Sequence, residues 1–332
     1  MLKRLGKQTI HFETPPVISG FASVAGKREA DGPLGKTFTY TSEDISFGEK
    51  TWEKSEMRMQ KDVLDKALQN AKLTVDDLDF LFSGDLLNQC VAASFGLRET
   101  NAPFLGIYGA CSTMAEGLIL AAMMIDGRFA KNTAAVASSH FCTAERQYRF
   151  PLEYGGQRPP TAQWTVTGAG AAILSENGSG MKITHAITGK IVDKGIKDAN
   201  NMGGAMAPAA YETLKTLFAE TNTKPTDYDM IATGDLGDIG KDILIRLFHR
   251  DGVNIQPVYD DCGCLIYDLE DEDIKSGGSG CGCSASVLCG HLLTQNYKKL
   301  IFAGTGALLS TTTALQGESI PGICHAVILE RT

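Results

Sequence analysis

Short apolar segments alternate along the chain with longer segments in which apolar residues recur every three to four positions. Residues 52–71 place Val63 and Leu68 on one side and charged residues opposite, which predicts an amphipathic helix. Residues 113–125 are apolar on nearly all sides, so this helix is expected to be buried all round. The segment 208–218 opens with a proline, which predicts that a helix starts there. Strands alternating with helices indicate an α/β fold with mostly parallel sheets.

The apolar strands and the turns after them recur once in the same order. Four pairs of segments match between the two halves: 77–86 with 227–236, 109–112 with 282–284, 135–139 with 300–304, and 171–176 with 326–330. One match between short apolar strands carries little weight, but four in one order indicate a duplicated unit. The boundary falls near residues 177–180, which predicts units at 1–178 and 179–332. A buried helix in each unit favours two sheets with a helical layer between them.

The composition is that of a globular protein with an acidic surface. Of 332 residues, 43% are hydrophobic and 21% charged, so the chain can bury a sizeable core. The formal net charge of −8 argues against nucleic acid as a partner. The longest apolar run, 118–125, is too short to cross a bilayer, and Met1–Lys7 precedes no apolar stretch. We therefore expect a soluble protein, made on the cytoplasmic side, with no secretory signal or transmembrane segment.

Nine cysteines in a long chain without a secretory signal are expected to be reduced thiols. Two Cys-Gly-Cys pairs, 262–264 and 281–283, lie in the same half as Cys289 and raise the question of zinc. Zinc motifs usually have a wider spacing than a single glycine. Both pairs lie in glycine-rich corners where small residues are needed, so packing is favoured over metal binding. We predict no metal and no cofactor.

Cys111 follows the strand-like segment 104–108 and lies just before the apolar helix. A helix N-terminus presents unpaired N–H groups and a partial positive charge, which stabilise a thiolate, an oxyanion or a bound carboxylate. Position alone leaves two interpretations open. Cys111 is either a nucleophile or anion-binding corner, or a small buried residue that fills space between close-packed helices.

Several motifs at these positions resemble the thiolase and ketoacyl-synthase superfamily. They are the small residue-Cys-Ser at 110–112 and the segments Gly168–Leu174, Gly280–Val287 and Gly304–Leu308. The resemblance covers about residues 15–330. It implies a duplicated α/β fold in which two mixed, mostly parallel sheets form a five-layer αβαβα arrangement. It also implies a homodimer formed across an edge strand.

The same resemblance bears on catalysis. Condensing enzymes of the superfamily combine the cysteine with a histidine and an asparagine or second histidine, which polarise a carbonyl. The resemblance puts Asp235 and Cys281 near those two positions, and neither side chain is an equivalent donor. Condensation is therefore not expected, and an acyltransferase using Cys111 with a non-standard base is kept as an alternative. His140 follows a strand ending at Ser139 and either lines the same cavity or is a satisfied loop histidine.

Within the superfamily the sequence is most similar to members from endospore-forming bacteria that bind dipicolinic acid (pyridine-2,6-dicarboxylic acid). This resemblance implies that the ligand, free or as its calcium chelate, is moved across the inner spore membrane with membrane-embedded sporulation proteins. A planar dianion is expected to meet arginines and helix N-termini. The candidate ligand-binding residues are Cys111, Ser112, His140, Arg146, Arg149, Arg158, Asp235, Cys281 and Thr305.

Other features bear on calcium and on the membrane. For a ligand already chelated to calcium, Asp260, Asp261 and the acidic run 268–273 offer oxygen ligands, although such runs are usually solvated. A ligand-free scaffold for membrane partners is a further alternative. The resemblance implies a peripheral position at the inner membrane of the forespore or spore, yet the cations among residues 3–7 are too few to hold a protein to lipid alone.

Overall fold

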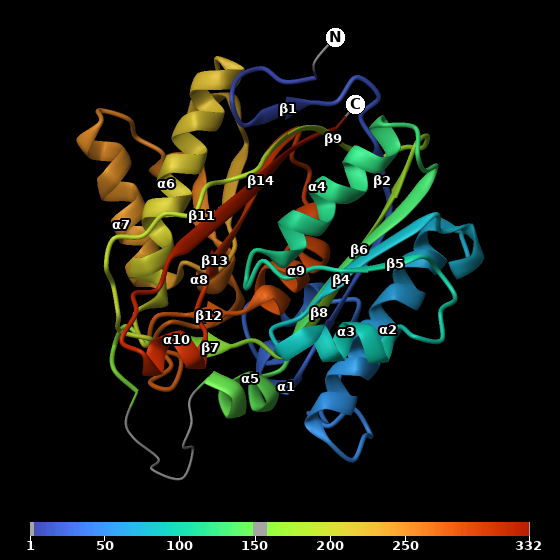
Figure 1. The fold of residues 1–332 in the computed structure, drawn as a ribbon, viewed down its shortest axis with the longest axis horizontal. Helices are drawn as coiled ribbons and strands as arrows, with labels where there is room; N and C mark the ends of the chain where they lie inside the picture. Colours follow the sequence, from blue (N-terminus) through green and yellow to red (C-terminus); the bar gives the residue numbers. More distant parts are fainter. Residues whose placement is uncertain (1–2, 149–157, 332) are drawn as a thin grey trace.

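The computed structural model describes residues 3–148 and 158–331, in which two five-stranded units share one strand order (Figure 1). The first unit has the order β2 (Val17–Ala25), β8 (Gly168–Ser175), β6 (Asn132–Ser139), β4 (Phe80–Gly84), β5 (Phe104–Gly106). The second has the order β9 (Met181–Ile187), β14 (Gly322–Arg331), β13 (Lys299–Ala307), β10 (Met230–Thr233), β11 (Tyr259–Asp261). In each, the first two neighbouring pairs are antiparallel and the last two parallel. In each unit one strand, β8 or β14, therefore runs against the other four, which share one direction. This confirms the predicted duplication and the mostly parallel strand direction.

The two units also touch through their strands. Val17 of β2 pairs with Lys182 of β9, so the two expected sheets form one hydrogen-bonded path joined at this pair. Strand β1 (Thr9–His11) pairs with β9, so the start of the chain lies on the sheet of the second unit. Strand β3 (Tyr40–Thr41) pairs with β2, and a separate ribbon consists of β7 (Trp164–Thr165) and β12 (Gly278–Ser279). The division at residues 178 and 179 stays a prediction.

The helices form three layers around the sheets (Figure 1). Helices α2 (Trp52–Ala71) and α3 (Val91–Gly96) lie on the outer face of the first unit, and α6 (Met202–Thr221) and α7 (Gly237–Arg250) on that of the second. Helices α4 (Thr113–Asp126) and α9 (Cys281–Gly290) lie between the sheets. This is the expected five-layer arrangement. Shorter helices are α1 (Lys27–Ala30), α5 (Phe141–Tyr148), α8 (Cys262–Ile266) and α10 (Thr311–Leu315).

The strand period explains why both faces of each sheet are apolar. Along β6, Ala134 and Val136 pack under α2, whereas Ala135 and Ala137 belong to the core around α4 and α9. Successive side chains of a strand point to opposite faces, so a strand between two helical layers must be apolar throughout. The helix α9 can approach β8 closely because a side chain on Gly170 would lie 2.2 Å from the carbonyl oxygen of Ala285.

Helix starts follow local capping more closely than apolar spacing. Helix α2 covers the predicted range, and Thr51 caps it by accepting a hydrogen bond from the Lys54 N–H. Helix α6, in contrast, begins six residues before Pro208. Asn201 caps it by accepting from the Gly204 N–H at 3.2 Å, so the predicted start at the proline is wrong. Pro208 lies inside the helix between the buried residues Ala207 and Ala209.

Candidate functional site

The turn that carries Cys111 lies between β5 and α4 and is closed by its own hydroxyl groups. Ser112 Oγ donates to the carbonyl oxygen of Gly109 at 2.6 Å, and Thr113 Oγ1 donates to that of Ala110 at 2.7 Å. The predicted ligand residue Ser112 is thus buried and occupied within the turn. Strand β13 passes against this turn, since a side chain on Gly306 would lie 2.6 Å from the Gly109 carbonyl oxygen. The glycine at 306 therefore allows β13 to reach the start of α4.

Three of the predicted residues meet at the foot of α4. The thiol of Cys111 lies beside the carboxylate of Asp235, which follows β10, and the two groups influence each other's pKa. Asp235 is completely buried and also accepts from Thr305 Oγ1 at 2.9 Å and from the Gly280 N–H at 2.8 Å. Thr305 accepts in turn from the Asp235 N–H at 3.0 Å. These contacts fix the carboxylate against the sulfur.

The surroundings of Cys111 keep it protonated. Burial raises the pKa of the Cys111 thiol well above its ordinary value, and the charge of Asp235 raises this pKa further. Burial also raises the pKa of Asp235 from 3.8 to about 7, although the nearby Cys111 thiol and the hydrogen bonds from Gly280 and Thr305 oppose the shift. Because the pKa of the thiol is the higher of the two, the proton stays on sulfur. Reactive cysteines have the opposite, electropositive environment.

Cys281 lies close to this group and contacts different atoms. It opens α9, is completely buried, and its Sγ donates to the carbonyl oxygen of Ser138 at 2.9 Å. Burial raises the pKa of this thiol as well. Ser284, one turn further along α9, donates to the Cys111 carbonyl oxygen at 3.4 Å. Cys281 therefore ties the start of α9 to β6 and does not line the cavity described next.

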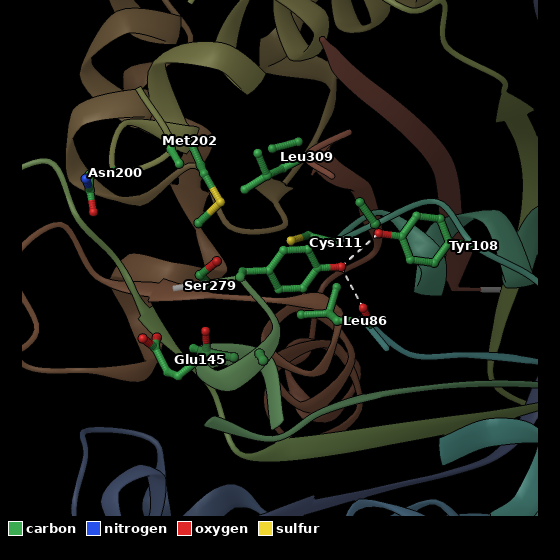
Figure 2. Close-up of a pocket in the computed structure, with 14 residues that line it drawn as sticks. Leu86, Tyr108, Cys111, Glu145, Asn200, Met202, Ser279 and Leu309 are labelled. Atoms are coloured by element: carbon green, nitrogen blue, oxygen red, sulfur yellow. Dashed lines mark hydrogen bonds between the residues drawn. The ribbon is translucent and has the colours of Figure 1, made fainter. Parts of the chain in front are cut away.

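A cavity with about 590 Å³ of empty space, including its mouth, opens beside Cys111 (Figure 2). Its walls come from both units: α5, the β7–β12 ribbon, the segment before α6 and the end of β13. Tyr148 donates to the Leu86 carbonyl oxygen at 2.6 Å, and its hydroxyl lies 3.1 Å from that of Tyr108. The lining residues are Leu86, Tyr108, Ala110, Cys111, Ala144, Glu145, Tyr148, Thr165, Ala199, Asn200, Met202, Ser279, Ala307 and Leu309.

His140 is buried but does not line this cavity. Its Nδ1 accepts from the Cys142 N–H at 3.2 Å, so the proton is on Nε2, which donates to the Ile45 carbonyl oxygen at 2.8 Å. The ring packs against Trp52 with 5.5 Å between centroids. Burial lowers the pKa of His140, which keeps the ring neutral. Both nitrogens are satisfied, which matches the loop-histidine alternative.

The predicted arginines are separated in space. Arg146 pairs with Glu53 and is 54% exposed on a different part of the surface. Arg158 pairs with Glu145, a cavity residue, at 3.0 Å, and its guanidinium stacks 4.6 Å from the Trp164 ring centre. Arg158 therefore supports the cavity wall through its contact with Glu145. Arg149 lies outside the described residues.

Comparison with known proteins places the chain in a family. Residues 6–330 match the family named stage V sporulation protein AD. The Bacillus subtilis (strain 168) protein of that name is 45% identical over 334 residues. The match spans 99% of this chain and 98% of the B. subtilis protein. The chain belongs to the stage V sporulation protein AD family.

Solved structures of other proteins share the fold of this family member. The 3-oxoacyl-[acyl-carrier-protein] synthase III of Aquifex aeolicus VF5 is 15% identical, with a TM-score of 0.57 over 95% of this chain and 99% of that one. OleA of Xanthomonas campestris, with bound lauric acid and lauroyl-CoA, is 12% identical, with a TM-score of 0.63 over 96% and 99%. At these identities the likeness concerns the fold alone, which is thiolase-like.

Several cavity residues of this family member carry no sequence signal. Asn200 belongs to a polar segment between β9 and α6 that has no periodic pattern, and Met202 is the first residue of α6. Glu145 and Tyr148 lie on α5, where the charge pattern indicates an ordinary surface helix. Tyr108 is the exception, because it stands three residues before Cys111 on a segment already singled out.

Residues 3–148 and 158–331 contain neither a metal-binding cluster nor a membrane-spanning helix. No set of three or more His, Cys, Asp or Glu side chains is grouped so as to hold a metal ion there. No helix in this part of the chain combines the length and the hydropathy that membrane crossing requires. All nine cysteines are unpaired thiols, and both Cys-Gly-Cys pairs open helices, α8 and α9.

Proposed function

We propose that the protein binds dipicolinic acid without converting it, in the cavity beside Cys111. This binding serves movement of the compound across the inner spore membrane, together with other stage V sporulation A membrane proteins. Family membership and the thiolase-like fold support a sporulation role on an enzyme-like scaffold. The observation that carries the proposal is that the buried carboxylate of Asp235 lies beside the Cys111 thiol and raises its pKa.

The pairing of a buried thiol with a buried carboxylate argues against the acyltransferase alternative. Asp235 is the group in position to act as the base, and its pKa is about 7, far below that of the thiol. Transfer of the proton to Asp235 is therefore uphill, and a thiolate formed beside an ionised carboxylate would be repelled by it. A cavity next to a protonated sulfur favours binding over nucleophilic chemistry.

The described lining favours the calcium chelate over the free dianion. Among the described lining residues no lysine or arginine contributes, and the carboxylate of Glu145 is paired with Arg158 behind the cavity wall. A dianion chelated by Ca²⁺ is neutral, and calcium accepts additional oxygen ligands such as carboxylates, amides and hydroxyls. The flat ring matches a lining rich in aromatic and thioether side chains, which include Tyr108, Tyr148 and Met202.

Calorimetry with dipicolinate, with and without equimolar calcium, tests the proposal. Saturable heat is expected for the wild type, with tighter binding when calcium is present. Ala199→Trp fills the cavity from a half-buried loop position and should abolish the heat, whereas Ala219→Trp, on the exposed side of α6, should not. No heat under either condition refutes binding, and unchanged heat in both Ala199→Trp and Cys111→Leu refutes this location. An acyl adduct on Cys111 after incubation with acyl thioesters would support the acyltransferase instead.

A further inference from the structure

A groove lies at the end of α4 opposite Cys111. The N-terminal segment, the last turn of α4 and the residue after β9 border it, through Lys3, Arg4, Lys7, Met123, Gly127 and Thr188. In Figure 1 the N-terminal segment and the C-terminal end of α4 lie at the same end of the molecule. The fourteen residues of α4 span about 21 Å, which separates this groove from the cavity. We call it the N-terminal groove.

Unpaired cations gather around the N-terminal groove. Arg4 and Lys7 line it, and Arg128 follows Gly127 in the turn after α4. Within the described part of the chain, no carboxylate lies at ion-pair distance from these three side chains, whereas Lys3 pairs with Asp126 at 2.9 Å and with Glu13 at 3.4 Å. The nearby carboxylate of Glu220 accepts the backbone N–H groups of residues 7–9.

A neighbouring hollow adds two lysines next to two carboxylates. It shares Gln8 with the N-terminal groove and is bordered by Lys190 and Lys194, which Asp193 and Glu212 balance in charge. The unpaired cations of the surface are therefore those of the N-terminal groove. The sequence segment 3–7 alone offers too few cations to hold a protein to lipid. The fold brings Arg128, Lys190 and Lys194 to the same surface.

Large apolar side chains project from the same surface. Phe129 is 74% exposed, Ile191 67%, Leu5 47% and Met123 44%. Phe129 follows Arg128 in a tight turn, and its ring lies against Gly127. Leu5 stands between the cations Arg4 and Lys7. Basic residues interleaved with exposed Phe and Leu are the combination by which proteins attach to anionic membrane surfaces.

We infer that this surface docks the protein on an anionic lipid bilayer. Phe129 and Leu5 enter the headgroup region, and Arg4, Lys7 and Arg128 lie next to lipid phosphates. A bilayer fits better than an acidic protein partner because Phe129 and Leu5 are exposed on separate turns and line neither hollow. The inference rests on the membrane location within the proposed function and is independent of dipicolinate binding. Docking in this way places Cys111 at the end of α4 away from the lipid.

Vesicle co-sedimentation tests the role of charge. The wild type is expected to bind vesicles of phosphatidylglycerol and phosphatidylcholine, less so at high salt, and to bind pure phosphatidylcholine weakly. Each basic residue near an anionic surface strengthens attachment about fivefold, so the Arg4→Glu, Lys7→Glu, Arg128→Glu variant should lose at least about a hundredfold. A control variant, Lys36→Glu, Lys54→Glu, Lys224→Glu, has the same net charge with exposed changes elsewhere and should retain binding. Equal loss in both variants, or no wild-type binding, overturns the inference.

Fluorescence tests the position of the turn. Phe129→Trp is expected to shift its emission to shorter wavelength with anionic vesicles, after subtraction of the wild-type signal. An unshifted emission in the presence of bound vesicles overturns the assignment of this turn. Calorimetry of the triple charge variant with calcium and dipicolinate separates the two proposals. If the triple charge variant keeps its heat of dipicolinate binding but loses vesicle binding, docking at this surface is supported. If the wild type binds vesicles but gives no heat with dipicolinate, docking is supported and dipicolinate binding is refuted.

Discussion

The buried thiol of Cys111 lies beside the carboxylate of Asp235, a residue whose counterpart in the first repeat makes different contacts. That counterpart, Asp85, follows β4 and accepts the N–H groups of Leu87 and Ala93 at 2.8 and 2.7 Å. One aspartate therefore fixes the backbone at the start of α3, whereas the other holds a buried sulfur. The repeats have the same strand order, and their matching carboxylates differ in what packs against them.

Removal of the charge at Asp235 should make Cys111 more reactive. Asparagine has nearly the same shape without the charge, so Asp235→Asn lowers the pKa of the thiol. We expect alkylation of Cys111 by iodoacetamide at about pH 8 to become about tenfold faster or more. Mass spectrometry of the Cys111 peptide over time measures the rate, with the peptide of the buried Cys324, which Asp235 does not influence, as the control. An unchanged rate would show that Asp235 does not govern the sulfur.

The same substitution should alter how stability depends on pH. The pKa of Asp235 is about 7 in the folded protein and 3.8 as the ordinary value. A raised folded-state pKa stabilises the protein at low pH, and this contribution is lost as the pH rises from about 4 to about 7. The wild type should therefore lose stability relative to Asp235→Asn across this range, by at most about 4 kcal/mol. Urea unfolding of both proteins measures the difference, and a difference independent of pH contradicts the prediction.

Substitution of Gly306 should disturb the Cys111 turn. The new methyl group of Gly306→Ala would lie 2.6 Å from the Gly109 carbonyl oxygen, so β13 and the turn must separate. We expect a loss of about 1–3 kcal/mol in the free energy of unfolding, together with weaker dipicolinate binding. Gly106→Ala is the control, because its methyl group meets only the Phe104 ring, at 3.3 Å. Equal unfolding midpoints for the two variants would argue against close packing at Gly306.

The edge strand β5 is the expected site of dimer formation. It ends the strand order of the first unit, and Phe104 and Leu105 are 38% and 43% exposed. Sedimentation of the wild type should give the mass of a dimer. Leu105→Lys should shift the protein toward monomer because a charge on an edge opposes strand pairing. Leu315→Lys, 90% exposed on α10, should have no effect, and a monomeric wild type would refute the dimer.

Local sequence determined the elements and their duplication. The range of α2, the buried character of α4 and the order of four repeated segments all follow from spacing and capping, which act over a few residues. The predicted start of α6 at Pro208 is wrong because the side chain of Asn201 caps the helix further upstream. The site around Cys111 can be predicted from sequence because a local motif and the start of a helix coincide there.

The tertiary structure decided which polar groups meet. Thr305, Gly280 and Asp235 come from three distant segments of the chain. No periodic pattern in the sequence indicates that they meet near Cys111. His140 turns to the Ile45 carbonyl oxygen although its position in sequence suits a cavity residue equally well. Apolar spacing tells which face of an element is buried, but the neighbours of a buried polar side chain depend on how layers stack and on which hydrogen bonds remain to be satisfied. For this reason the sequence alone was enough to predict the secondary structure and the duplicated fold. The residues that meet at the site were determined by how the two halves pack together.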